Sequence, residues 1–172
     1  LTGDLAEGER QLTRMIEIAT ATGNHFAVIT ARAQLAILAL ERGDDDGARI
    51  QLALAQPTEN IEDYHGYIHF ALIAATEARV ESRAGNAKEA IAALAVCQRL
   101  RPLLTRAIPW YAVQTLLEMA EAYCDLGEVN AARAVLLDAV EIARYRPDLG
   151  THGERVSQLQ AKSRSRDGDH LV

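Results

Sequence analysis

Small and apolar residues recur at fixed distances after four glycines of the chain. These glycines, Gly3, Gly43, Gly85 and Gly127, are 40, 42 and 42 residues apart. Five residues after each stands Ala or Gly, nine after it stands Leu, and twelve after it stands Met, Ala or Cys. Steps of four and three residues place these positions on one face of an α-helix. The pattern therefore predicts four copies of one helical unit.

Each of the four glycines is followed by Asp, Asn or Glu, which predicts a turn between two helices. Glycine can end a helix with positive φ, and the next residue can cap the helix that follows. The small residue five positions on lets two helix backbones approach, and the leucine fills the space between them. We therefore expect the unit to be an antiparallel helical hairpin.

Turn residues and prolines divide the chain into about eight predicted helices. The predicted ranges are 4–22, 25–42, 45–56, 64–84, 85–102, 108–126, 129–145 and 149–162. Pro102 stops the fifth helix, Pro109 stands in the first turn of the sixth, and Pro147 ends the seventh. Residues 1–162 are expected to form one helical repeat domain, and the polar residues 163–172 a linker or disordered tail.

The composition supports an all-α fold with an aliphatic core. The 172 residues are 49% hydrophobic but only 5% aromatic, so the core must be built from Ala, Leu, Ile and Val. No run alternates β-branched and polar residues as a half-buried strand would. We expect a right-handed superhelix of stacked antiparallel helical hairpins, an α-solenoid of about eight helices.

The glycine turn, the small residue, the leucine and the closing Pro102 resemble the second helix of a tetratricopeptide repeat. The residues before each turn resemble its first helix, with Ala36, Ala78 and Ala120 seven positions before the next glycine. The chain departs from that repeat in two ways. It has no large aromatic residue in the first helix, and its period exceeds the usual length of about 34 residues.

A narrower resemblance covers about residues 1–162. The segments "EARVESRAGNAKEAIAALA", "RAIPWYAVQTLLEMAEAYCDLGEVNAARAVLLDAVEIARYRPDLG" and "ERVSQLQAK" look like the helical repeat region of large LuxR-family regulators of the maltose-regulator type, common in actinobacteria. The resemblance implies a non-catalytic sensory domain of a transcriptional regulator. Such a domain would bind a small-molecule inducer, a peptide or a protein partner and relay its state to nucleotide-binding and DNA-binding domains.

Two other interpretations stay open. The chain could be a generic tetratricopeptide-like scaffold or adaptor for protein–protein interaction, unrelated to transcription. It could also be an enzyme with an all-α active site, although no catalytic signature and no cofactor motif is recognised. Because position 1 is Leu rather than Met, we expect the chain to be part of a longer protein.

Charge and motifs argue against nucleic-acid and nucleotide binding by this chain. Its net charge is −6, opposite to that of a typical nucleic-acid-binding domain, and it contains no phosphate-binding loop. Acidic and basic bands alternate along the chain; they could favour a homodimer, but solvated helix faces are the simpler interpretation.

The sequence also bears on location. No apolar run is long enough to span a membrane, and no export signal is seen. Two cysteines, 27 residues apart, fit a reducing cytoplasm better than a disulfide framework.

The segment "YHGYIHF" holds the first candidate site. His65 and His69 are four residues apart, so on a helix their rings would share one face and could bind a metal ion. No third ligand stands nearby, and we predict no metal site. With Tyr64, the pair is interpreted as a packed helix start or as part of a ligand or peptide surface.

Trp110 and the carboxylates of the sixth predicted helix are further candidates. Trp110 is interpreted as a core residue between adjacent repeats, with recognition as the alternative. Glu118, Glu121 and Asp125 lie on one helix face, and a solvated face is favoured over a catalytic cluster. Cys97 occupies the small-residue position of its repeat and is interpreted as an inert core thiol.

A ligand groove is expected along the first helices of the stacked hairpins, which line the concave side of such arrays. Counting back from each turn glycine places polar residues on that side: Thr30, Gln34, Thr76, Arg79, Arg83, Gln114, Glu118 and Glu121. Arg79 and Arg83 could receive a carboxylate or phosphate group, and ordinary surface arginines are the alternative.

Overall fold

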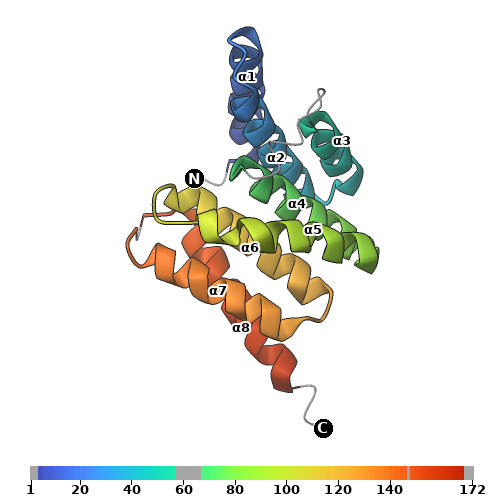
Figure 1. Cartoon of the computed structure of the whole chain (residues 1–172), viewed down its shortest axis with the longest axis vertical. Coiled ribbons are helices and arrows are strands. Elements are labelled where there is room, and N and C mark those ends of the chain that lie inside the picture. Colours follow the sequence, from blue (N-terminus) through green and yellow to red (C-terminus); the bar gives the residue numbers. More distant parts are fainter. Residues whose placement is uncertain (1–3, 57–66, 147, 169–172) are drawn as a thin grey trace.

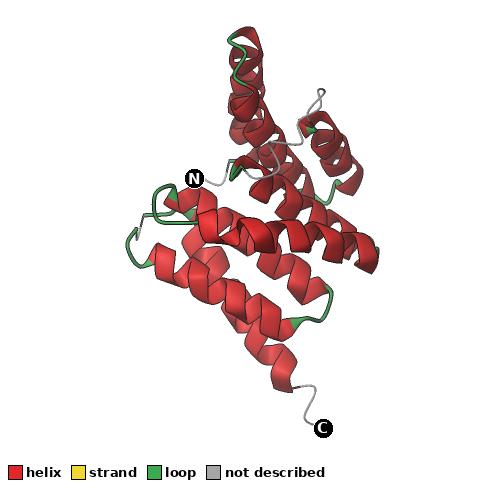
Figure 2. Cartoon of the chain, viewed as in Figure 1, coloured by secondary structure: helices red, strands yellow, loops and turns green. Residues whose placement is uncertain are grey.

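The structure is a computed structural model that describes residues 4–56, 67–146 and 148–168. Within these ranges the regular secondary structure is helical, and no strand occurs (Figure 2). The α-helices are α1 (Leu5–Ala21), α2 (His25–Glu41), α3 (Asp45–Ala55), α4 (His69–Arg83), α5 (Ala87–Leu100), α6 (Pro109–Asp125), α7 (Val129–Ala143) and α8 (Thr151–Gly168). The 3₁₀ turn η2 (Arg101–Leu103) follows α5. The expected all-α class and the eight helices are confirmed for the described part of the chain.

The glycine turns have the conformation that their sequence predicts. Gly43, Gly85 and Gly127 adopt φ values of 76°, 79° and 79°. In each turn the residue after the glycine donates its backbone N–H to a carbonyl five positions earlier, as Asp44 does to Ala39 at 2.9 Å. This bond closes the end of the preceding helix in the Schellman manner. Gly3, the first glycine of the series, lies outside the described residues.

The predicted helix caps are only partly present. Asp44 accepts a hydrogen bond from the backbone N–H of Gly47 at 2.8 Å, and Asp4 caps α1 in the same way. Asn86 does not cap α5, because its amide instead donates to Glu81 at 2.5 Å. Glu128 makes no side-chain cap either. The turn geometry is therefore set by glycine, whereas the capping residue varies.

Helices next to one another in sequence pack as pairs, and alternate helices pack across the pairs (Figure 1). α2 pairs with α3, α4 with α5, and α6 with α7. In addition α2 contacts α4, α4 contacts α6, and α6 contacts α8, so these four helices lie in a row. α1 packs on α2 at one end of the row. The row brings together side chains about 40 residues apart in sequence.

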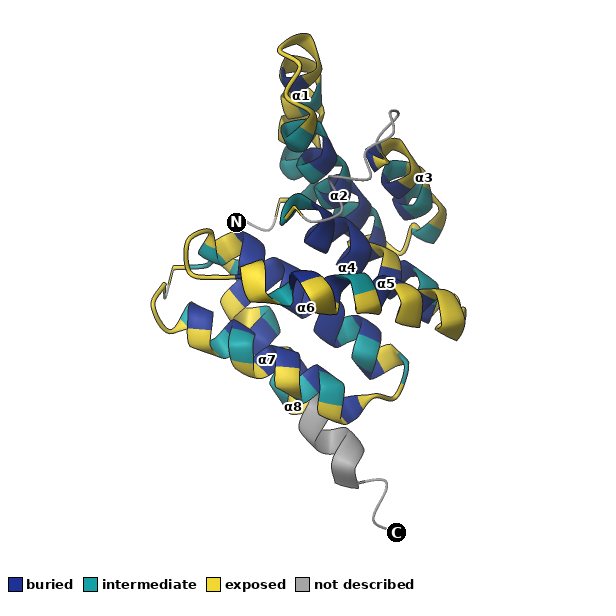
Figure 3. Ribbon diagram, in the orientation of Figure 1, coloured by how far each residue is buried: buried dark blue, intermediate teal, exposed yellow. Residues whose placement is uncertain are grey.

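Buried positions lie where neighbouring helices face each other (Figure 3), and alanine recurs at these positions. Ala36, Ala78 and Ala120, seven residues before the turn glycines, are fully buried. The small residues after Gly43, Gly85 and Gly127 are buried as well, whereas Gly8 of the first copy is partly exposed. A methyl side chain leaves room for the neighbouring backbone, which explains why the chain repeats alanine there.

Some boundaries differ from the predicted ones. The predicted helix 64–84 begins at His69 in the described part of the chain, and residues 57–66 are outside it. α8 continues to Gly168, beyond the predicted end at residue 162 and into the segment expected as a linker. Its polar sequence offers little apolar periodicity, so the helix end could not be read from the pattern.

Candidate ligand groove between α1, α2, α6 and α8

The row of helices places Gln34 of α2 opposite Gln114 of α6, 80 residues apart in sequence. Each side-chain amide donates to the other's oxygen, with N–O distances of 2.5 and 2.9 Å. The two predicted groove residues thus join across the row, and both line hollows on the α1 side. Because each amide keeps a further donor and acceptor, the pair can also bond to a ligand.

One hollow, the Trp110 lobe, lies between α1, α2 and the start of α6. Its volume is about 790 Å³. Apolar side chains dominate its wall, among them Leu12, Met15, Leu38, Trp110 and Leu149. Trp110 is 45% exposed, so the interpretation of this residue as core was wrong. Its neighbour Tyr111 is the buried one.

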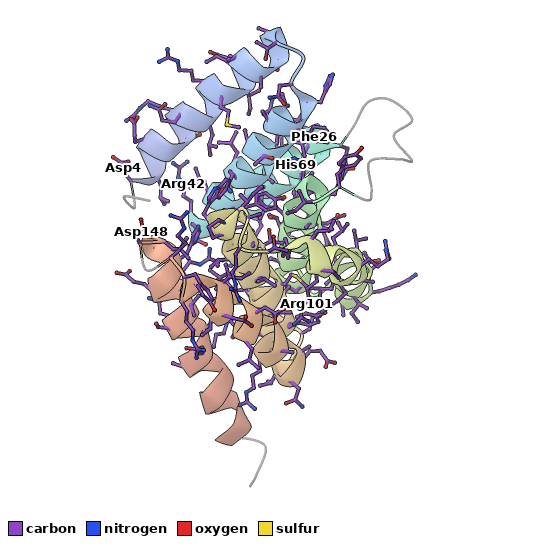
Figure 4. The ribbon with its side chains drawn as sticks, turned by 60° about the vertical axis from the view of Figure 1, so that its left-hand side comes forward. Asp4, Phe26, Arg42, His69, Arg101 and Asp148 are labelled. Atoms are coloured by element: carbon purple, nitrogen blue, oxygen red, sulfur yellow. The ribbon has the colours of Figure 1, made fainter. Side chains whose placement is uncertain are left out.

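The second hollow, the His152 lobe, lies between α1, α2 and α8 and has a volume of about 500 Å³. Its charged lining residues are Asp4, Glu7, Glu41, Glu154 and Arg155. Asp4, which lines this lobe, and Asp148, which lines the other one, are labelled in Figure 4.

The two lobes share lining residues and form one groove. The shared residues are Gly8, Gln11, Gln34, Leu38 and Gln114. A Cβ at Gly8 would stand 3.5 Å from Leu38 Cδ1, so even a methyl group would narrow the passage. The groove therefore runs from an apolar end, past the glutamine pair, to a mainly acidic end.

A network of ion pairs lies beneath the acidic end. Arg79 of α4 contacts Glu118 and Glu121 of α6, each at 2.7 Å, and Glu41 of α2 at 3.1 Å. Arg155 of α8 contacts Glu118 at 3.0 Å and Glu121 at 2.6 Å. The network thus connects all four helices of the row.

Burial and charge oppose each other within this network. Burial by itself would raise the pKa of the Glu118 carboxyl, but the guanidiniums of Arg155 and Arg79 outweigh it and lower that pKa. Burial would likewise lower the pKa of both arginines, and the facing carboxylates raise it instead. The groups therefore stay charged and hold one another in place.

The network corrects two predictions about charged residues. Glu118 was expected on a solvated face, but it is fully buried, and Glu121 is mostly buried. Arg79 is not an ordinary surface arginine either, because it is 5% exposed and is paired within the protein. Arg83 pairs with Asp45 of α3 at 3.1 Å and lies away from the groove.

His152 is a groove residue that sequence reasoning missed. It is 3% exposed, and neither ring nitrogen has a hydrogen-bond partner among the described residues. Burial, assisted by the charge of Arg155, lowers its pKa to about 4, so the ring is neutral at pH 7. A single histidine in a polar segment gives no signal of burial, because nothing in the sequence shows what α8 packs on.

Two of the remaining predicted residues, Thr30 of α2 and His69 of α4, lie together. His69 stacks on Phe26 at 4.8 Å between ring centroids, and its Nδ1 lies 3.3 Å from Thr30 Oγ1 (Figure 4). Burial lowers the pKa of His69. Thr76 is buried and donates its hydroxyl to the Leu72 carbonyl of its own helix at 2.7 Å. Tyr64 and His65 lie outside the described residues.

The two cysteines are buried, as expected for Cys97. Burial raises the pKa of the Cys97 thiol to about 12. No group of three or more His, Cys, Asp or Glu residues that could hold a metal ion occurs in the described ranges. Nor does any helix in those ranges have the length and apolar character needed to span a bilayer.

Comparison of the chain with protein-family models, with curated proteins and with solved structures finds no match.

Proposed function

We propose that this chain is a non-catalytic binding domain that senses an inducer or a partner through the groove between α1, α2, α6 and α8. The observation that carries the proposal is the continuity of the two lobes past the Gln34–Gln114 pair. Lobe volumes of about 790 and 500 Å³ fall within the usual range for ligand sites, and apolar walls with a few polar groups are typical of them.

We further propose that the paired helices form a tetratricopeptide-like superhelix within a LuxR-family regulator. The row α2, α4, α6 and α8, with α3, α5 and α7 as second helices, supports the stacked-hairpin arrangement. The quoted segments that resemble the maltose-regulator type support the family. In such a protein, the groove would face the concave side, where solenoids bind their ligands.

The ion-pair network supplies a route for relaying the bound state. Arg155 contacts the His152 lobe on one side and Glu118 and Glu121 on the other. A ligand that moves α8 would break the contacts of Arg155 with Glu118 and Glu121. The DNA-binding domain implied by the resemblance would read this change through α8.

Trp110 gives a direct test of groove binding, because it is the only tryptophan of the chain and lines the groove. Random peptides displayed on phage and a library of small metabolites would be screened against the purified chain. Binding in the groove shifts the Trp110 emission. Met15→Arg, on the groove wall, should abolish binding, whereas Leu54→Arg, exposed on α3, should not. Equal binding to both variants would contradict the proposed site.

The regulator assignment has its own test. The isolated chain, with a net charge of −6, should show no sequence-specific retention of DNA at moderate salt. Retention that survives competitor DNA would overturn the proposed division of labour between this chain and a separate DNA-binding domain.

A further inference from the structure

We propose that the groove binds a small organic cation with an apolar body, its ammonium group in the His152 lobe and its body in the Trp110 lobe. This inference rests on the proposed function, since it names the ligand class for that same groove. Four observations support it: excess carboxylates, an unbalanced buried network, a neutral imidazole and an adjoining apolar wall.

Carboxylates outnumber guanidiniums along the His152 lobe. Asp4, Glu7, Glu41 and Glu154 face it, against Arg155 alone. Glu7 is also held by Arg10, and Asp4 caps α1. Arg155, the one guanidinium among the described residues that line the lobe, is already bound to two carboxylates beneath it. The lobe therefore presents negative charge to a ligand.

The network beneath the lobe carries the same sign. It contains the three carboxylates of Glu41, Glu118 and Glu121 and the two guanidiniums of Arg79 and Arg155, which leaves a net charge of −1. Glu41 is the most exposed of its carboxylates, at 38%, and also lines the lobe. The excess charge of the network is thus available at the lobe, on the side chain of Glu41.

His152 provides a hydrogen-bond acceptor, which favours a ligand that carries an N–H donor. The residue lines the lobe and is 3% exposed, and its two ring nitrogens, themselves buried, have no hydrogen-bond partner among the described residues. A buried polar group without a hydrogen-bond partner destabilises the fold, and a ligand that bonds to it offsets that cost. Because burial keeps the imidazole neutral, one nitrogen can accept a hydrogen bond from an ammonium N–H.

The Trp110 lobe suits an uncharged, apolar body. Its charged lining residues, Arg146 and Asp148, are of opposite sign. Leu12, Met15 and Leu149 offer aliphatic surface, and the exposed indole of Trp110 can stack on an aromatic ring. A ligand that spans both lobes is therefore amphipathic, with its charge at one end only.

The test uses three probes of one shape and different charge: 4-phenylbutylamine, 4-phenylbutanol and 4-phenylbutyrate. Each is titrated into the full chain while the emission of Trp110 is followed. We expect the amine to bind at least about tenfold more tightly than the alcohol, and the carboxylate to bind most weakly. Because charge drives the difference, raising the salt concentration should reduce the advantage of the amine.

Glu154→Gln tests the acidic end without changing its shape. This residue is exposed at the start of α8, so the variant should fold normally. We expect it to lose most of the advantage of the amine over the alcohol and to bind the alcohol unchanged. Glu89→Gln, exposed on α5 and remote from the groove, is the matched control and should behave as the unaltered chain.

The outcomes separate this inference from the proposed function. If the alcohol binds and Met15→Arg abolishes that binding, the proposal that the groove is a binding site is supported. Equal affinity for amine and alcohol then overturns the cation class alone. A preference for the carboxylate probe would overturn it as well. If none of the three probes binds while displayed peptides do, the ligand is a peptide and the small-cation inference is wrong.

Discussion

Arg155 of α8 donates to Glu118 of α6 at 3.0 Å, and Glu118 is fully buried between Arg155 and Arg79. The contact joins residues 37 apart in sequence and fastens α8 to the row of helices. A buried carboxylate between two guanidiniums is stabilising only while all three are present, because any one left alone bears an uncompensated desolvation cost.

The first prediction concerns Glu118. Glu118→Gln should destabilise the fold by about 3–5 kcal/mol, because it leaves the buried arginines short of a negative charge. Urea denaturation followed by circular dichroism measures the loss. Glu141→Gln is the control: Glu141 pairs with Arg106 at 2.7 Å on the surface, and its loss should cost no more than about 1 kcal/mol. Equal losses of stability in the two variants would show that the buried network contributes no more to stability than a surface ion pair does.

The second prediction concerns pH and His152. Its pKa in the fold, about 4, lies below the ordinary value, so the unfolded chain binds the proton more readily. Stability from this group is complete above about pH 6.5 and falls as the pH drops towards 4, by about 2 kcal/mol between pH 7 and pH 5. Glu118, whose pKa is also lowered, adds a loss at lower pH still.

The pH prediction is checked by urea midpoints at pH 7 and pH 5. His152→Leu should reduce the difference between them and leave a remainder from His69, whose pKa burial also lowers. His25→Gln, at the exposed start of α2, should leave the difference in place. A His152→Leu protein with an undiminished pH dependence would assign the acid sensitivity to other groups.

The third prediction concerns the small residue after each turn. Ala90 is fully buried in α5, so Ala90→Arg would force a charged side chain between two helices and should unfold the chain. Ala132→Arg should do the same in α7. Ala92→Arg, two residues away on the exposed face of α5, should melt as the unaltered chain does. Unchanged melting temperatures for Ala90→Arg and Ala132→Arg would refute the alignment of the repeats.

The fourth prediction separates two glycines. Gly85 adopts a φ of 79°, so Gly85→Ala should destabilise the fold by about 1 kcal/mol or more, although nothing obstructs the added methyl group. Gly153 lies in the first turn of α8 with open space around it, and Gly153→Ala should stabilise the fold by up to about 1 kcal/mol. Thermal melting measures the change in stability of each variant. Changes of the same sign would contradict the assignment of these effects to backbone conformation.

Some residues of the groove could be predicted from the sequence, and others could not. Gln34 and Gln114 were placed on the groove side by counting back from Gly43 and Gly127, since helical spacing determines which side of a helix a residue occupies. The same counting placed Glu118 on that side, but the sequence predicted that its carboxylate would be exposed to solvent. Its burial depends on Arg79 and Arg155, which come from two other helices.

The burial of Trp110 and of His152 could not be predicted from the sequence: one is more exposed than expected, and the other is buried without any signal. The lone tryptophan was expected in the core, because large aromatic residues are usually buried. It is exposed because α6 begins there and Tyr111, the next residue, occupies the buried position. His152 carried no signal at all, since its environment is created by residues of α1 and α2 more than 100 positions earlier.

The sequence by itself determined the helices, their turns and the positions where backbones come close. Those features depend on local spacing, on glycine at positive φ and on alanine at repeated intervals. Only the tertiary structure decided which charges are buried together and where the groove lies. Both result from the packing of α1 on α2 and of α8 on α6, which joins residues whose distance along the chain leaves no local pattern.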